Sequence, residues 1–144
     1  MANHYKSIIV AIDGSEQAEY AFRKSIDVAG SNEDSTLTIV NVIDTPPFRA
    51  DHSFMDEAQQ ESEKLLNSYK EQANAEGVAN VKVVIEYGSP RSIITKEISN
   101  SVEADLIICG ATGLNTVERF LIGSVSEAIV RSAKCDVMVI RTPE

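Results

Sequence analysis

The sequence contains a glycine-punctuated segment, Gly110-Ala-Thr-Gly-Leu-Asn-Thr-Val-Glu-Arg-Phe-Leu-Ile-Gly-Ser-Val-Ser126. It follows an apolar run, Asp105 to Cys109, that predicts a buried strand, and it leads into an amphipathic run, Val125 to Ala133, that predicts a helix. Glycines let backbone N–H groups approach an anion closely, and a helix N-terminus adds unpaired donors and the positive end of its dipole. This order of strand, glycine loop and helix therefore predicts a phosphate-binding site.

The rest of the chain alternates strand and helix patterns. Apolar runs rich in β-branched residues predict strands buried on both faces, and they lie at Tyr5–Ile12, Ser35–Ile43, Val81–Tyr87, Asp105–Cys109 and Asp136–Ile140. Residues at helical spacing predict the intervening helices: Ala18, Phe22, Ile26 and Ala29; Met55, Ala58, Leu65, Leu66, Tyr69 and Ala73; and Ile93, Ile94, Glu97 and Ile98. Such alternation predicts an α/β fold, an open five-stranded parallel sheet with helices on both faces.

Turn and cap signals separate these elements. Asp13-Gly-Ser15 follows the first strand, two prolines in Asp44-Thr-Pro-Pro47 open a loop that we expect to reach about Ser53, and Ser89-Pro90 predicts an N-cap followed by the first helical residue. In open parallel sheets ligands bind beyond the carboxyl ends of the strands, where the strand order reverses. We therefore expect the strand ends at Asp13 and Gly110 to be neighbours.

Composition limits the classes of protein. The 144 residues fit one domain, and a formal net charge of −9 argues against nucleic acid as the partner, because phosphate backbones are bound by clustered Lys and Arg. No run approaches the ~18 apolar residues of a membrane span, and no apolar leader follows Met1, so we expect a cytoplasmic protein with no membrane contact. Cys109 and Cys135 form no Cys-x-x-Cys pair and are expected to be small buried thiols.

The spacing Gly110-x2-Gly113-x9-Gly123-Ser124 resembles the nucleotide-binding signature of the universal stress protein family, in its ATP-binding subgroup. The resemblance extends over nearly the whole chain, since Ile8–Ser15 is similar to the opening strand and turn of the family and Ile39–Val42 to its second strand. It implies a single domain over residues 1–144, a Rossmann-like nucleotide-binding fold and the strand order 3-2-1-4-5. In that order the first and fourth strands are neighbours, as expected above for the strand ends at Asp13 and Gly110.

The resemblance also implies residue roles. The adenine and ribose region would be lined by Ala11, Ile12, Asp13 and Val42; Gly110 and Gly113 would face the ribose and first phosphates; and the N–H groups and hydroxyls of Gly123, Ser124, Val125 and Ser126 would hold the β and γ phosphates. Arg119 is the cation inside the motif, and its guanidinium could bind phosphate oxygens with two hydrogen bonds. Alternatively, it is a solvated loop arginine, or it is paired with Glu118 or another acid.

Several residues also have purely structural interpretations. Ser124-x-x-Glu127 is a capping-box pattern, in which the serine hydroxyl would serve its own helix. Asp13 could belong to nothing more than a turn and a helix cap. Beside a polyphosphate, its carboxylate would be repelled unless it accepted from the ribose or helped to hold a divalent metal, so Mg²⁺ is a candidate ion.

The sequence lacks the marks of a committed phosphoryl-transfer enzyme. It has no Gly-x4-Gly-Lys-Ser/Thr lysine, no kinase-type catalytic loop and no Ser-Gly-Gly-x-Asp-Ser loop. We therefore expect an ATP-binding regulatory protein of the stress response, in which the nucleotide sets conformation or recognition by an unknown protein partner. The alternatives are a nucleotide-using hydrolase or transferase with slow ATP turnover, and an interaction module that binds no nucleotide.

Family members usually pair through the last strand, which here is Val137 to Arg141. The resemblance thus implies a homodimer. Asp136 stands where many relatives have proline, which restores a backbone donor and adds a charge near this edge.

Overall fold

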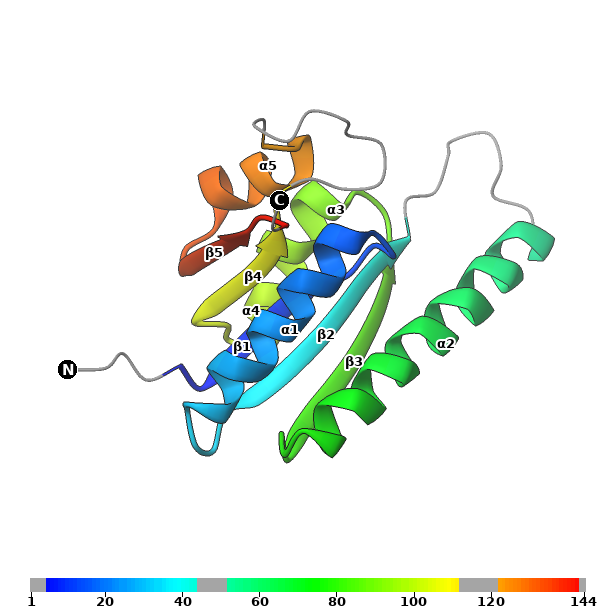
Figure 1. Cartoon of the computed structure of the whole chain (residues 1–144). Helices are drawn as coiled ribbons and strands as arrows, with labels where there is room; N and C mark the ends of the chain where they lie inside the picture. Colours follow the sequence, from blue (N-terminus) through cyan, green and yellow to red (C-terminus); the bar gives the residue numbers. More distant parts are fainter. Residues whose placement is uncertain (1–4, 44–51, 112–121, 143–144) are drawn as a thin grey trace.

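The protein forms one five-stranded parallel sheet covered by helices on both faces (Figure 1). The computed structural model describes residues 5–43, 52–111 and 122–142. The strands are β1 (Ser7–Ala11), β2 (Thr36–Ile43), β3 (Asn80–Tyr87), β4 (Leu106–Gly110) and β5 (Asp136–Ile140). Their order in the sheet is β3-β2-β1-β4-β5, which confirms the expected 3-2-1-4-5. β1 pairs with both β2 and β4, so the strand order reverses beside its end, as the sequence analysis required.

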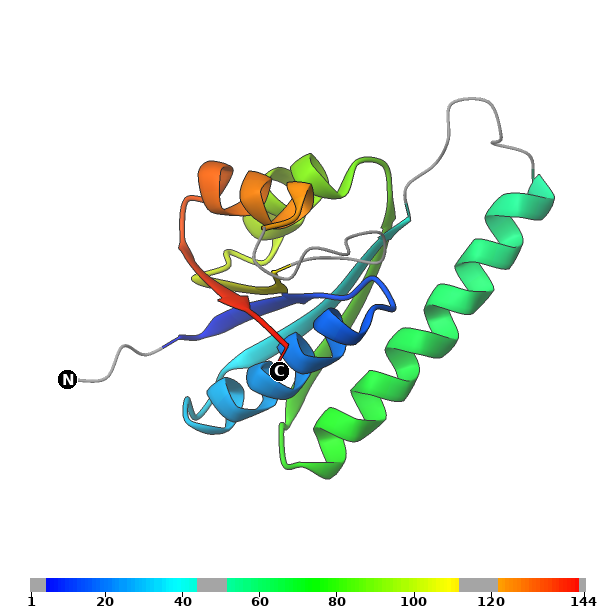
Figure 2. The ribbon, with the colours of Figure 1, turned by 45° about the horizontal axis from the view of Figure 1, so that its top comes forward.

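The helices divide between the two faces of the sheet. In chain order they are α1 (Glu16–Gly30), α2 (His52–Ala75), α3 (Pro90–Ser92), the π-helix η1 (Ile93–Ile98), α4 (Ser99–Ser101) and α5 (Ser124–Ser132). α1 and α2 cover one face, and the other helices cover the opposite face (Figures 1 and 2). α2 begins at His52, close to the expected loop end at about Ser53; residues 44–51 lie outside the described part.

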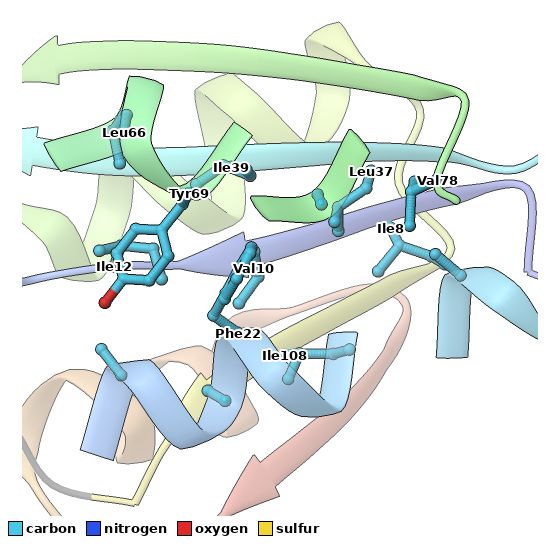
Figure 3. Close-up of a cluster of buried hydrophobic side chains, with 14 of the residues drawn as sticks. Ile8, Val10, Ile12, Phe22, Leu37, Ile39, Leu66, Tyr69, Val78 and Ile108 are labelled. Atoms are coloured by element: carbon cyan, nitrogen blue, oxygen red, sulfur yellow. The ribbon is translucent and has the colours of Figure 1, made fainter. Parts of the chain in front are cut away.

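The first core lies between the sheet and the helices α1 and α2. Alternate residues of β1 and β2, among them Val10 and Ile39, point into it and are fully buried (Figure 3). On the helices, the rings of Phe22 and Tyr69 pack with their centroids 4.4 Å apart. Burial on this face accounts for the helical spacing of the apolar residues in α1 and α2.

The second core lies under the other helices and explains why the strand sequences are continuously apolar. Ile9 and Ile107 from the strands are fully buried here against Ile129 of α5. Cys109 joins this core, and its burial raises the pKa of the thiol to about 11. Cys109 is thus buried as expected, whereas Cys135 is only half-buried, although its burial also raises the pKa of its thiol.

The connection from β3 to β4 is irregular. Gly88 adopts φ +136° and turns the chain, after which Ser89 occupies the N-cap position and Pro90 the first helical position, as expected, although the Ser89 side chain makes no capping bond. The helix then widens into η1, where the N–H of Ser99 donates to the carbonyl of Ile94. A π-turn inserts an extra residue into a helix and frequently occurs at functional sites.

β5 is an edge strand of the sheet, with half-buried side chains from residue 137 to 140. At its start, the hydroxyl of Tyr5 donates to Asp136 Oδ2 at 2.7 Å, so this aspartate is tied to the segment before β1. Pairing of two copies along this edge stays a prediction. Within the described residues, no helix combines the length and the apolar character needed to cross a membrane.

Candidate functional site

A cavity of about 760 Å³ opens at the carboxyl ends of the strands, where the strand order reverses between β1 and β4. The residues that the sequence analysis singled out and that line this cavity are Ala11, Ile12, Asp13, Val42, Gly110, Gly123, Ser124, Val125 and Ser126. Gly113 and Arg119 lie outside the described residues. The topology thus brings together residues from four separate segments of the chain, and their roles toward a ligand stay predictions.

Asp13 lies in the tight turn between β1 and α1. Its Oδ1 accepts a hydrogen bond from the N–H of Ser15 at 2.9 Å, and the intervening Gly14 adopts φ +85°, which disfavours residues with a Cβ. Ser15 caps α1 by accepting from the N–H of Ala18 at 3.1 Å. The turn-and-cap interpretation is therefore correct, yet Asp13 remains exposed and lines the cavity, and within the described residues its Oδ2 receives no hydrogen bond.

The start of α5 presents to the same cavity backbone donors that have no partner among the described residues. Gly123 is the N-cap, with φ −68° and ψ 162°, and its carbonyl accepts the first helical bond from the N–H of Glu127 at 2.9 Å. The N–H groups of Ser124, Val125 and Ser126 precede that bond and have no intrahelical partner. The capping-box interpretation of Ser124 is wrong, because Ser124 is the first helical residue and no side chain caps this helix.

The Ser126 hydroxyl has a different role from the one expected. The side chain is 3% exposed, and its Oγ donates to the carbonyl of Ala111 at 2.8 Å, with the carbonyl of Gly123 at 3.0 Å. The N–H of Gly123 also donates to the Ala111 carbonyl, at 2.7 Å. A hydroxyl has only one proton to donate. Through its bond to the Ala111 carbonyl, the Ser126 hydroxyl links the two described ends of the glycine segment. Its N–H remains available to a phosphate, but the expected contribution of its hydroxyl is not supported.

Gly110 lies at the end of β4, where α1 approaches the sheet. A Cβ at this position would lie 2.9 Å from Gln17 Cβ and 3.0 Å from the Gln17 carbonyl carbon. Contacts between a real Cβ and its neighbours are essentially never shorter than 3.0 Å. Gly110 is thus required by the packing of α1, in addition to lining the cavity.

A polar network that was not predicted from the sequence holds the wall of the cavity. Asn41 Nδ2 donates to the carbonyl of Ile12 at 2.7 Å, and Asn41 Oδ1 accepts from Ser62 Oγ of α2 at 2.7 Å. Both Asn41 and Ser62 line the cavity. The signal was present, because Asn41 is a polar residue inside the apolar run of β2. Its amide fixes the end of β1 to β2 and α2.

Arg91 is the second residue that the sequence analysis missed. It follows Ser89 and Pro90 at the start of α3, lines the cavity, and donates from Nη2 to Ser124 Oγ at 3.3 Å. The other charged residues lining the described cavity are Asp13 and Glu61, so Arg91 supplies its positive charge. A cation beside the start of α5 strengthens the preference of that helix end for an anion.

A metal would depend on the ligand itself. Across the described segments, no group of three or more His, Cys, Asp or Glu side chains could hold a metal ion. Asp13 alone supplies too few ligands for Mg²⁺, which prefers octahedral oxygen coordination and is often bound by one or two carboxylates together with phosphates. Among the described residues, Asp13 would hold Mg²⁺ only together with oxygen ligands from a bound polyphosphate.

Comparison with known proteins identifies the family of the chain and agrees with its fold. The model of the universal stress protein family matches residues 4–141. A protein of Staphylococcus saprophyticus subsp. saprophyticus that is named for this family is 52% identical over 144 residues, covering 97% of this chain and 86% of the relative. The structure of universal stress protein UspA from Lactobacillus plantarum has a TM-score of 0.88 at 27% identity, covering 97% of this chain and 100% of that one. A universal stress protein solved in complex with cAMP has a TM-score of 0.77 at 25% identity, covering 98% and 100%.

Proposed function

Since the chain belongs to the universal stress protein family, we propose that it binds an adenine nucleotide, ATP, in the cavity at the strand ends and acts as a single-domain regulatory protein. The observation that carries this proposal is the convergence on one cavity of the unpaired N–H groups of α5 and the apolar ends of β1 and β2. A relative of similar fold was solved with cAMP, which shares the adenine and ribose of ATP.

The two kinds of lining suit the two ends of a nucleotide. Ala11, Val42 and Ile43 at the ends of β1 and β2, with Leu65 of α2, offer half-buried apolar surface to a purine. The start of α5 offers backbone donors and the positive end of a dipole to phosphates. The volume of about 760 Å³ lies within the range of roughly 300–1,000 Å³ that is common for ligand pockets.

The described hydroxyls favour binding over catalysis. A phosphoryl-transfer site needs a group that orients or deprotonates the attacking oxygen. Ser62 donates to the amide of Asn41, and Ser124 accepts from the guanidinium of Arg91, so neither serine is paired with a base. We therefore propose that bound ATP sets the conformation that a protein partner recognises, with hydrolysis at most slow.

The second part of the proposal is that the protein forms a homodimer through β5, an edge strand of the sheet. Two copies would pair along this edge through residues 137–141, and nucleotide binding at the nearby start of α5 would bias that arrangement. The proposed location is the cytoplasm. Mg²⁺ would enter with the phosphates, held in part by Asp13.

The test uses nucleotide carried by the purified protein. With no Trp and four Tyr, the protein absorbs weakly at 280 nm, so bound adenine should dominate near 260 nm and can be identified by chromatography after denaturation. Calorimetry on nucleotide-free protein then gives the ATP affinity. Absence of binding would overturn the proposal, and several turnovers of ATP per second would contradict a regulatory role in favour of a hydrolase or transferase.

A matched pair of glycine variants locates the site. Gly123→Val keeps a backbone conformation that valine adopts readily, since φ is −68° and ψ is 162°, but places a branched side chain at the start of α5. We expect it to lose ATP binding while its circular dichroism spectrum is unchanged. Gly30→Val, at the end of α1 with nothing within 4 Å, should bind ATP normally. Equal ATP affinity in both variants would show that the phosphates lie elsewhere.

A further inference from the structure

α3 lies beside α5 on the same face of the sheet (Figures 1 and 2). Arg91 belongs to α3 and contacts Ser124, the first residue of α5. We propose that Arg91 makes the site selective for the number of phosphates, so that it distinguishes ATP and ADP from AMP and cyclic AMP. This inference rests on the proposed function, and it assigns the discrimination to a residue that lies far from the glycine segment in sequence.

The backbone of Arg91 is held firmly in place. Gly88 makes the turn out of β3, and Pro90 fixes its own φ immediately before Arg91. The hydroxyl of Thr95, which is 6% exposed, donates to the Arg91 carbonyl at 3.2 Å, and the neighbouring Ile94 is buried in the second core. The extra residue of η1 follows immediately, so this short segment is anchored from both ends. The Arg91 side chain therefore extends from a fixed backbone position beside the cavity.

The guanidinium itself is available to an anion. Its contact with Ser124 Oγ is long, 3.3 Å, and the acceptor is neutral. The ion pairs made within the described part of the chain are Arg23–Glu19 and Arg131–Glu127, and no carboxylate there pairs with Arg91. Since a guanidinium has five N–H donors in a planar fork, most of them remain for phosphate oxygens, which it binds with two parallel hydrogen bonds.

The charges of the cavity determine where a polyphosphate can lie. Asp13 and Glu61 line it at the end of β1 and on α2, and both repel phosphate. Arg91 and the N–H groups at the start of α5 attract it, in a protein whose formal net charge is −9. With the base against the ends of β1 and β2, the phosphate chain must therefore extend toward α5 and α3.

The position of Arg91 along the phosphate chain makes binding depend on the number of phosphates. Ser124 is the first helical residue, and Arg91 contacts its side chain from α3, so the guanidinium lies beside the N–H groups at the start of α5. A single phosphate can be held by the N–H groups alone, whereas each further phosphate adds charge next to Arg91. Binding of ATP and ADP should then depend on Arg91 much more than binding of AMP or cyclic AMP.

The experiment compares Arg91→Gln with Arg131→Gln by calorimetry at about 0.15 M salt, with ATP, ADP, AMP and cyclic AMP, each with and without Mg²⁺. Arg131 is a matched control, because it lies on α5 itself, is exposed, and pairs with Glu127 outside the cavity. Arg91→Gln should weaken ATP binding about tenfold, as expected for loss of a hydrogen bond to a charged group, and AMP binding less than twofold. Arg131→Gln should change neither.

The outcomes separate this inference from the function on which it rests. If the wild-type protein binds no adenine nucleotide, the proposed function fails. If the wild type binds ATP but Arg91→Gln weakens all four nucleotides equally, or none, the selectivity assigned to Arg91 is wrong. Arg91→Lys keeps the charge and loses the fork, so it should recover part of the ATP affinity. The nucleotide-free variants should melt at the temperature of the wild type, which checks that the fold is unchanged.

Discussion

Substitution of Gly110 by alanine tests the close approach of α1 to the end of β4. The added Cβ would lie 2.9 Å from Gln17 Cβ, 3.0 Å from its carbonyl carbon and 3.1 Å from its carbonyl oxygen. Two of these three atoms belong to the backbone of α1, so the conflict cannot be relieved by rotating a side chain. Inserting a group into a tightly packed region costs about 1–3 kcal/mol. For a domain of this size, ~2 kcal/mol lowers the melting temperature by roughly 4–8 °C.

The assay is thermal and urea unfolding followed by circular dichroism, with Gly30→Ala as the control. Gly30 is the last residue of α1, and a Cβ there would meet nothing within 4 Å. Because alanine has a higher helix propensity than glycine, Gly30→Ala should be as stable as the wild type or slightly more stable. A Gly110→Ala variant that melts within about 1 °C of the wild type would refute the packing of α1 against β4 that forms this side of the cavity.

Three further changes follow from the hydrogen bonds and burial. Ser126→Ala should lower the free energy of unfolding in urea by about 1–2 kcal/mol, while ATP affinity changes less than twofold, because the hydroxyl bonds the chain and not the ligand. Asn41→Ala should cost about 2 kcal/mol and also weaken ATP binding, whereas Asn100→Ala on the exposed surface of α4 should do neither. Burial raises the pKa of Cys109 from 9.0 to about 11, so the folded state keeps its proton where the unfolded state loses it. The contribution of this thiol to the free energy of unfolding should therefore be fully present below pH 9 and be lost between pH 9 and 11. Over that range, the free energy of unfolding should fall more steeply in the wild type than in Cys109→Ala.

The fold could be predicted because each strand carries its own signal. Strands buried on both faces need continuous apolar residues, and helices that cover one face need apolar residues at helical spacing, so element types and their order followed from local sequence. The pairing of β1 with β4 could be expected because ligands bind where the strand order reverses, so that Asp13 and Gly110, at the ends of these strands, had to lie close together. The π-helix did not follow, because the spacing of Ile94 and Ile98 fits an α-helix equally well. Glu97, expected among the residues that carry this helix, is exposed.

The site was predicted where its signal is local and missed where its contacts are distant. The glycine segment marks the start of α5, but the partner of the Ser126 hydroxyl is a carbonyl 15 residues earlier, which a capping pattern cannot reveal. Arg91 lies 33 residues before Ser124, and only the crossover from β3 to β4 brings the two together. One rule would have found it: residues directly after any parallel strand belong to the same edge of the sheet.

The central claim is that ATP occupies the cavity with its phosphates on the start of α5. The most direct measurement is a titration of the backbone amide NMR signals with ATP. We expect saturable shifts that are largest at the N–H groups of Ser124, Val125 and Ser126, accompanied by shifts at Ile12 and Val42 where the base would lie. Saturable ATP binding that leaves the amides of residues 124–126 unmoved, or no binding at all, would contradict the account.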